Sequence, residues 1–372
     1  MQFSCDSRGW KSAGDRTPTV SERHESIMDP ITQTVCGAIV AQAIFNNKLG
    51  RSAVLFGAIG GILPDIDVFF RFSDPIVAWD MHRHFTHALV FIPIGGLIAA
   101  LPLLLRSHWR QHWKLAIGAA TVGWATHGLI DCTTSYGTYL LWPFTNARYA
   151  WDNMSIIDPL FTLPILIGVV WALARGSTRP ARIALAYAFV YLGMSVVQHA
   201  RVMNVQQTLA EQRGHEIARG RVMPTFANQI VWRSLYESDG MLHADAVRVP
   251  LFGPAKVKRG ESVALLHLAD LAAPLKEDEY VRSSLETFSH FADGYISAVT
   301  QITADPVRIG DMRYSLVPEG FAPMWGIAIS RGNPKPTAWP TAFSGDRDRT
   351  LRNLWREILD DTGYESVTLE GE

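Results

Sequence analysis

The sequence predicts an all-α multispanning membrane domain followed by a small soluble α+β domain. Long apolar runs are confined to residues 31–199, most of the charge lies in residues 200–372, and short strand-like runs begin after residue 224. A net charge of −1 gives no reason to expect nucleic acid as a partner. The predicted parts are a disordered extension or mis-assigned start at 1–27, the membrane domain at 28–200, the soluble domain at 201–335 and a polar C-terminal tail at 336–372.

Residues 1–27 are polar and charged, without the apolar core that a secretory signal needs. Met28 begins the stretch MDPITQ, where the apolar pattern starts. We therefore expect Met28 to be the functional start. Three cysteines lie far apart and indicate neither a disulfide framework nor a CxxC metal site.

Apolar runs in the first half predict the membrane helices. A helix that crosses a bilayer needs about 20 apolar residues, with a lower limit of ~17. Two shorter, Gly-rich runs, 31–45 and 53–63, are expected to be tilted spans or half-inserted helices. The alternative is a soluble all-helical protein with unusually apolar helices. The runs that approach the spanning length are 88–105, 115–130, 159–174 and 183–197.

Charges between these runs predict the orientation. If every run crosses, loops 46–52, 106–114 and 175–182 lie on one side with eight Lys and Arg residues, and loops 64–87 and 131–158 hold three. Basic residues favour the cytoplasmic side. The C-terminal half is then expected in a periplasmic space, together with the polar motifs LPDID, HRHFTH and HGLID.

These motifs carry chemistry that is rare beside apolar segments. His127 and Asp131 are four residues apart on a predicted helix, so they share one face. Asp65 and Asp67 follow Pro64, where a helix should break and the chain can turn. Polar groups at this depth are costly and usually have a partner or a task.

The HRHFTH stretch adds three histidines. His82 and His87 are too far apart for one helical face, but they fit if His82 lies in a loop and His87 in the first helical turn. His84 is three residues before His87 and could share its face. Arg83 could clamp an anionic oxygen, and Thr86 could orient a ligand by hydrogen bonding.

Imidazole and carboxylate together suit Zn²⁺, and also Mn²⁺ or Fe²⁺. About six ligands exceed the needs of one tetrahedral ion, so the pattern is compatible with a two-metal site, and we expect one or two ions. Such a site can activate water for attack on an ester or phosphoester. Each motif also has a structural alternative, as a hydrogen-bonded pair, a helix end or an interfacial side chain. Their convergence at one membrane face favours a metal site with ligands Asp65, Asp67, His82, His87, His127 and Asp131, and His84 as a further candidate.

Five motifs in order, MDPITQTVCGA, GAIGGILPDIDV, HRHFTHAL, HGLIDCTTSYGTYLLWPF and SIIDPLFTLPIL, resemble the YdjM-like family of bacterial inner-membrane proteins over about residues 28–200. The resemblance implies a multi-pass inner-membrane protein with metal-dependent hydrolase activity, and a link to the DNA-damage response in some members. It maps the family's His/Asp motifs onto the same six ligands. The arrangement is also distantly similar to bacterial zinc-dependent phospholipase C.

The chain departs from the family pattern at two positions. Gln33 stands where the family usually has a histidine, which would remove one ligand. His84 stands where the family usually has a small residue, and could replace it. Two functions therefore remain open. One is hydrolysis of a membrane lipid or lipid-linked ester, and the other is a structural or sensory metal site related to stress.

Other polar and aromatic residues are predicted on the same side. The aromatic loop 134–144 is expected to be an interfacial belt, or else a wall over the metal site. Asp152 and Asp158 are reserve candidates for a ligand or general base. A helix is expected to leave the membrane at 200–222, and the α+β domain after it shows no nucleotide loop or ligand cluster.

Overall fold

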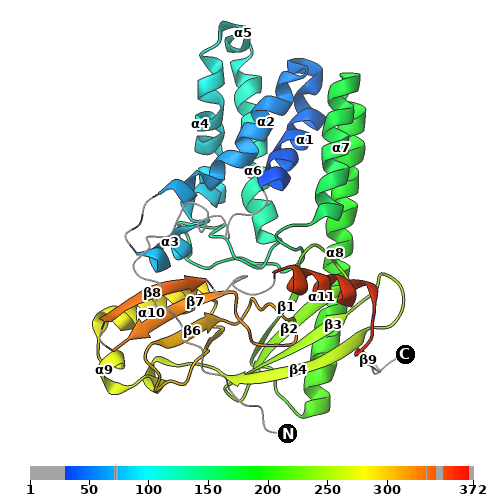
Figure 1. Ribbon diagram of the computed structural model, residues 1–372. Helices are drawn as coiled ribbons and strands as arrows, with labels where there is room; N and C mark the ends of the chain where they lie inside the picture. The colour runs from blue at the N-terminus through cyan, green and yellow to red at the C-terminus, as the bar shows by residue number, and fades with distance from the viewer. Residues whose placement is uncertain (1–29, 71, 73, 332, 341–346, 368–372) are drawn as a thin grey trace.

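The computed structural model describes residues 30–70, 72, 74–331, 333–340 and 347–367. A helical region comes first and a sheet-containing region follows (Figure 1), which confirms the predicted order of fold classes. The predicted extension 1–27 and the expected start at Met28 lie outside the described residues.

Side-by-side helices form the first region, with short 3₁₀ segments where the chain turns between them (Figure 1). The 3₁₀ segments are η2 (Leu63–Phe69), η3 (Phe85–His87) and η4 (Leu89–Phe91). The helices are α1 (Pro30–Leu49), α2 (Ser52–Ile62), α3 (Pro75–Met81), α4 (Ile92–Leu104), α5 (Ser107–Arg110), α6 (Trp113–Cys132), α7 (Pro159–Arg175) and α8 (Thr178–Arg213).

Within the described residues, Ser52–Phe69 and Thr178–Arg213 are long and apolar enough to cross a membrane. A third candidate arises if Pro75–His87 and Leu89–Leu104, which are bent by 52°, form one span. The predicted run 88–105 is therefore not one straight helix, because η4 comes before α4. The structure thus has a few candidate spans, and the larger number expected from the sequence stays a prediction.

Small residues let the central helices approach closely. A Cβ on Gly37 of α1 would lie 2.3 Å from the carbonyl oxygen of Gly57 in α2. A Cβ on Gly123 of α6 would lie 2.3 Å from that same oxygen. Such backbone contact is typical of helix packing in membranes, where close approach replaces the hydrophobic driving force.

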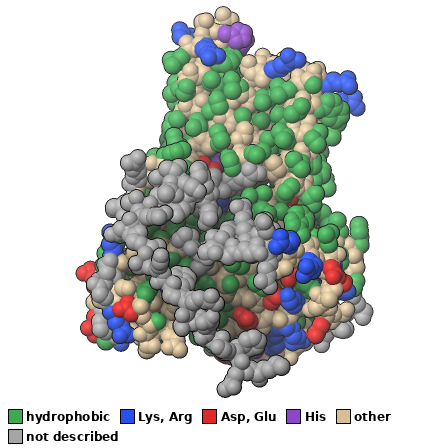
Figure 2. All heavy atoms as spheres, viewed as in Figure 1, with side chains coloured by type: hydrophobic (Ala, Val, Ile, Leu, Met, Phe, Trp, Pro, Cys, Tyr) green, Lys and Arg blue, Asp and Glu red, His purple; other side chains and the backbone are tan. Residues whose placement is uncertain are grey.

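The surface of the helical region is apolar along its sides. Hydrophobic side chains cover the bundle, and Lys and Arg side chains gather at its end away from the sheets (Figure 2). Exposed apolar residues such as Phe189 and Val190 of α8 belong to this surface. A belt of this kind matches a lipid environment better than water.

The second region holds two antiparallel sheets, in the orders β1-β2-β3-β4-β9 and β5-β6-β7-β8. The helix α10 (Glu279–Phe291) packs by its apolar face beside the second sheet, and α9 (Ala273–Lys276) and η5 (Leu268–Asp270) precede it. Residues of the predicted tail contribute to β8, α11 (Arg347–Leu359) and β9. The strands are β1 (Arg219–Pro224), β2 (Val231–Ser238), β3 (Met241–Arg248), β4 (Lys256–Ala264), β5 (Ile296–Ala298), β6 (Val307–Asp311), β7 (Trp325–Ser330), β8 (Asn333–Pro340) and β9 (Glu365–Ser366).

The two regions are joined by α8 and by side-chain contacts. The second half of α8 packs on the first sheet through Val202, Val205 and Leu209. Trp79 of α3 stacks on Phe291 of α10 at 5.9 Å. The sheets therefore lie directly against the loops that carry the polar motifs.

Candidate metal centre

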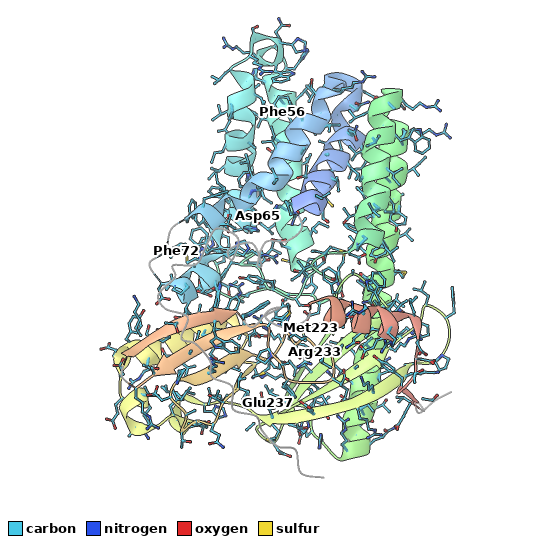
Figure 3. All side chains as sticks on the ribbon, in the orientation of Figure 1. Phe56, Asp65, Phe72, Met223, Arg233 and Glu237 are labelled. Atoms are coloured by element: carbon cyan, nitrogen blue, oxygen red, sulfur yellow. The ribbon has the colours of Figure 1, made fainter. Side chains whose placement is uncertain are left out.

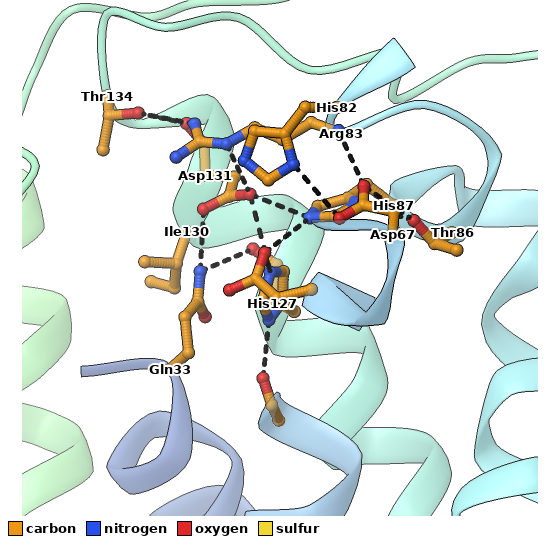
Figure 4. Close-up of polar contacts among 12 residues, drawn as sticks. Gln33, Asp67, His82, Arg83, Thr86, His87, His127, Ile130, Asp131 and Thr134 are labelled. Atoms are coloured by element: carbon orange, nitrogen blue, oxygen red, sulfur yellow. Dashed lines mark hydrogen bonds and ion pairs between the residues drawn. The ribbon is translucent and has the colours of Figure 1, made fainter. Parts of the chain in front are cut away.

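The predicted ligands converge at the end of the bundle that faces the sheets. Figure 3 labels Asp65 at this end, where α2 passes into η2. Figure 4 shows the side chains of η2, the turn before η3, η3 itself and α6 pointing toward one another. The contact between His127 of α6 and Asp65 of η2 joins segments that are 62 residues apart in sequence.

One group consists of Asp65, His87, His127 and Asp131, all of them buried. His127 Nε2 lies 3.2 Å from Asp65 Oδ1 and 3.6 Å from Asp131 Oδ2. His87 Nε2 lies 3.4 Å from Asp65 Oδ1 and 3.2 Å from Asp131 Oδ2. For metal–ligand bonds of about 2.0–2.1 Å, the edges of a tetrahedron measure ~3.3–3.4 Å. These four His–Asp distances are close to that edge length, and all four ligand atoms lie within 4.8 Å of one another, close enough to share one ion.

Hydrogen bonds turn the right nitrogen of each histidine toward this centre. His127 Nδ1 lies 2.6 Å from the carbonyl oxygen of Gly61, so it carries the proton and leaves Nε2 as the donor atom. His87 Nδ1 lies 2.9 Å from Thr86 Oγ1. Fixing one ring nitrogen so that the other can ligate is the usual support for a metal-binding histidine.

A second group, Asp65, Asp67 and His82, shares Asp65 with the first. His82 Nδ1 lies 3.1 Å from Asp67 Oδ1. In the described part of the chain, Asp65 Oδ2 and His82 Nε2 are buried and make no hydrogen bond. A shared carboxylate with a second oxygen available is the arrangement that can bridge two ions.

The formal charge of the cluster also fits a cation. With neutral imidazoles, the three carboxylates of Asp65, Asp67 and Asp131 and the one guanidinium of Arg83 leave a charge of −2. Buried uncompensated charge is very costly. One divalent ion would balance it, so the residues present fit a bound metal.

Arg83 and Thr86 support the carboxylates. The Arg83 guanidinium is fully buried, with Nε 3.2 Å from Asp131 Oδ2 and Nη1 donating to Thr134 Oγ1 at 3.1 Å. The Arg83 backbone N–H donates to Asp67 Oδ2 at 2.9 Å. The structure thus places Arg83 as a positioning residue for two carboxylates, where the sequence suggested an anion clamp.

Gln33 has a role that the sequence did not indicate. Its Nε2 donates to Asp131 Oδ1 at 2.7 Å (Figure 4). The residue at the family's histidine position therefore orients a ligand from outside the donor set. The only signal in the sequence was an amide side chain near the start of an apolar helix. Its spacing from the other motifs could not identify Asp131 as its hydrogen-bond partner.

Three candidates lie outside both groups. His84 packs against the tilted rings of Tyr139 and Trp142, with ring centroids at 4.6 and 5.4 Å, and belongs to neither group of possible ligands among the described residues. Asp152 pairs with Arg221 of β1 at 2.6 Å. Asp158 caps α7 by accepting from the Leu160 N–H at 3.1 Å. These two carboxylates have partners within the protein and belong to neither group.

The aromatic loop forms a wall of the centre. Tyr136 is buried, with its ring 5.5 Å from that of His82 and 4.7 Å from the Arg83 guanidinium carbon. On its other side Tyr136 lines a cavity of about 260 Å³ between the two regions, together with Arg221 and Arg313. The wall interpretation is therefore supported for this tyrosine, and Phe144, at the loop's end, is exposed as a belt residue would be.

The fold and site together define a helical membrane-type region that carries a buried Asp/His cluster able to hold a metal ion. Residues 28–202 match the family model of the YdjM inner membrane protein, which confirms the resemblance predicted from the five motifs. No curated protein and no solved structure matches the chain.

Proposed function

We propose that this protein is a multispanning inner-membrane enzyme, a metal-dependent hydrolase that acts on an ester or phosphoester. The observation that supports it most is the convergence of four buried ligand atoms, from Asp65, His87, His127 and Asp131, with His–Asp distances of 3.2–3.6 Å. The YdjM match to residues 28–202 supports the membrane location.

In this proposal the chain's own residues have separate tasks. Asp65, His87, His127 and Asp131 hold one divalent ion, with zinc the best fit to two nitrogens and two oxygens. Asp67 and His82 share Asp65 with this set and are the candidate ligands of a second ion, which the charge of −2 does not itself require. A bound ion supplies a water of lowered pKa and stabilises negative charge on the attacked ester.

Arg83, Thr86 and Gln33 keep the carboxylates and imidazoles in position by the contacts described above. We place the site on the periplasmic side, because loops on the opposite end carry eight Lys and Arg residues. A membrane lipid or lipid-linked ester is then the expected substrate, because the centre lies at the end of the bundle that we place at the outer surface of the bilayer.

The burial of the proposed ligands favours a second function, a structural or sensory metal site. All four residues of the first group are buried, and closed sites of this kind are typical of structural metals. In that case the ion stabilises the junction between helices and sheets, or reports metal availability under stress, without turnover.

The test is metal analysis of the detergent-purified protein, followed by turnover assays on a panel of phospholipids and soluble phosphoesters. The parent retains stoichiometric transition metal and hydrolyses a member of the panel, and Asp65→Ala and His127→Ala lose both. His108→Ala, in α5 at the other end of the bundle (Figure 1), is the matched control and retains both. Stoichiometric metal without turnover supports the structural or sensory function, and a metal-free parent contradicts both.

A further inference from the structure

Exposed apolar side chains on the sheet-containing region gather where it meets the helical bundle. Phe252 is 92 % exposed in the loop between β3 and β4, and its neighbour Leu251 is also exposed. Leu359, at the end of α11, is 79 % exposed, and Trp355 lies one helical turn before it. Solvent exposure of large apolar side chains in a cluster indicates a partner surface.

Hydrogen bonds join α11 to β3 and β4, although about 100 residues separate α11 from these strands in sequence. Arg248, the last residue of β3, donates from Nη2 to the Ile358 carbonyl oxygen of α11 at 3.1 Å. Lys258 of β4 contacts Glu357 of α11 at 3.2 Å. The end of α11 therefore lies beside the strands that flank the Phe252 loop.

Hydrogen bonds from α8 fix where the loop between β3 and β4 lies along the axis of that helix. Arg201 of α8 donates from Nη1 to the Pro250 carbonyl oxygen at 2.7 Å and from Nη2 to the Gly253 carbonyl oxygen at 2.8 Å. Val197 is the last strongly exposed apolar residue on α8 before Arg201. With a rise of 1.5 Å per residue, Arg201 lies only ~6 Å farther along the helix than Val197.

The apolar belt of the bundle therefore continues onto the sheet-containing region. Figure 1 shows α11 along the side of the sheets that faces the bundle. Figure 2 shows hydrophobic side chains on the surface of the sheet-containing region, directly beside the lower end of the bundle. Tryptophan, leucine and phenylalanine next to an exposed arginine, here Arg356, are the composition of interfacial membrane elements.

We infer that Leu251, Phe252, Trp355 and Leu359 form a lipid-binding patch that inserts into the headgroup region beside α8. The patch anchors the sheet-containing region flat against the bilayer and so holds it over the metal centre. This inference rests on the proposed membrane placement of the helices, and it is independent of metal binding and of hydrolysis.

The test is site-directed spin labelling of the full chain in liposomes of phosphatidylethanolamine and phosphatidylglycerol. Cys5→Ser leaves Cys36 and Cys132, which are buried, as the background cysteines. Labels are placed at Phe252→Cys, at Val190→Cys on the lipid-facing side of α8, and at Asp239→Cys in the turn between β2 and β3. Because β2 is eight residues long, Asp239 lies ~25 Å from the patch end of the sheet.

Collisions with oxygen report lipid and collisions with a water-soluble nickel chelate report water. The labels at 190 and 252 collide preferentially with oxygen, and nickel accessibility at 252 is at least about threefold lower than at 239. If 252 is as accessible to nickel as 239 while 190 stays in lipid, the patch does not bind the bilayer and the inference is overturned. If 190 is also in water, the membrane placement itself fails and the inference fails with it.

Discussion

Buried carboxylates are compensated differently in the two regions. In the sheet-containing region Asp311 and Asp245 are each held by an arginine, with Arg313 Nη2 at 2.7 Å and Arg213 Nη2 at 2.7 Å. In the helical region Asp65, Asp67 and Asp131 converge on histidines, with one arginine among them. The same type of residue is therefore buried with two kinds of partner.

The difference teaches how to recognise a ligand set. A guanidinium is always charged and cannot bind a metal, so a bidentate Arg–Asp pair is complete by itself. An imidazole is neutral near pH 7 and offers a lone pair, so a His–Asp cluster is complete only with protons or a cation. Burial tends to lower the pKa of Arg221, but its partner Asp152 raises it above the usual range, so that pair stays charged.

The largest expected effect separates the two kinds of cluster. Asp311→Ala leaves the Arg313 guanidinium buried without its carboxylate, which costs about 3–5 kcal/mol of unfolding free energy. Bound metal per chain should not change. Denaturant unfolding and metal analysis of the same sample check both statements.

A matched double variant serves as the control. Asp311→Leu with Arg313→Met removes both charges and should recover most of the lost stability. A fall in metal content in the folded Asp311→Ala protein would show that the two clusters are coupled, contrary to the comparison.

Metal removal should have the next largest effect. With free metal at 100 to 1,000 times its dissociation constant, linkage gives about 3–4 kcal/mol of stabilisation. A chelator should therefore lower the melting temperature of the parent and leave that of Asp65→Ala unchanged. Equal chelator sensitivity in parent and variant would argue against a metal at this cluster.

Removing the amide that orients Asp131 should have a smaller effect. Gln33→Ala takes away the 2.7 Å hydrogen bond to Asp131 and should weaken metal binding about 10- to 100-fold. Gln42→Ala is the matched control on the same helix, because Gln42 donates to the Val169 carbonyl oxygen far from the cluster. Competition with a chromophoric chelator measures both affinities, and equal values would show that Gln33 does not support the site.

The smallest effect is expected at His84. Phenylalanine preserves the aromatic packing against Tyr139 and Trp142, so His84→Phe should retain full metal content and change stability by no more than about 1 kcal/mol. Metal analysis and thermal unfolding check this. Loss of one metal equivalent would return His84 to the ligand set.

The sequence predicted which Asp and His side chains converge, because their spacing carries part of the geometry, and their role as ligands stays a prediction. The four-residue interval of His127 and Asp131 places both on one face of α6, and both are in the first group. The prediction of a helix break after Pro64 was wrong, because α2 continues directly into the 3₁₀ segment η2, which carries Asp65 and Asp67. The order of a helical and a sheet-containing region also followed from composition.

Other features depend on contacts that no local pattern contains. Arg83 has a φ of 64°, in the left-handed region, and this turn separates His82 from His84 and directs them to different neighbours. Gln33 and Gly61 act through tertiary contacts with α6. The bend before α4 arises where Gly128 lets the His87 backbone approach, since a Cβ there would lie 2.4 Å from the His87 carbonyl oxygen.

X-ray absorption spectroscopy of the protein loaded with one equivalent of zinc tests the central claim most directly. The account predicts a nitrogen and oxygen shell at about 2.0–2.1 Å, with the multiple scattering of two imidazoles from His87 and His127. His127→Ala should halve the imidazole contribution or lose the zinc. A parent protein that retains no zinc, or a zinc shell without imidazole scattering, would contradict the account.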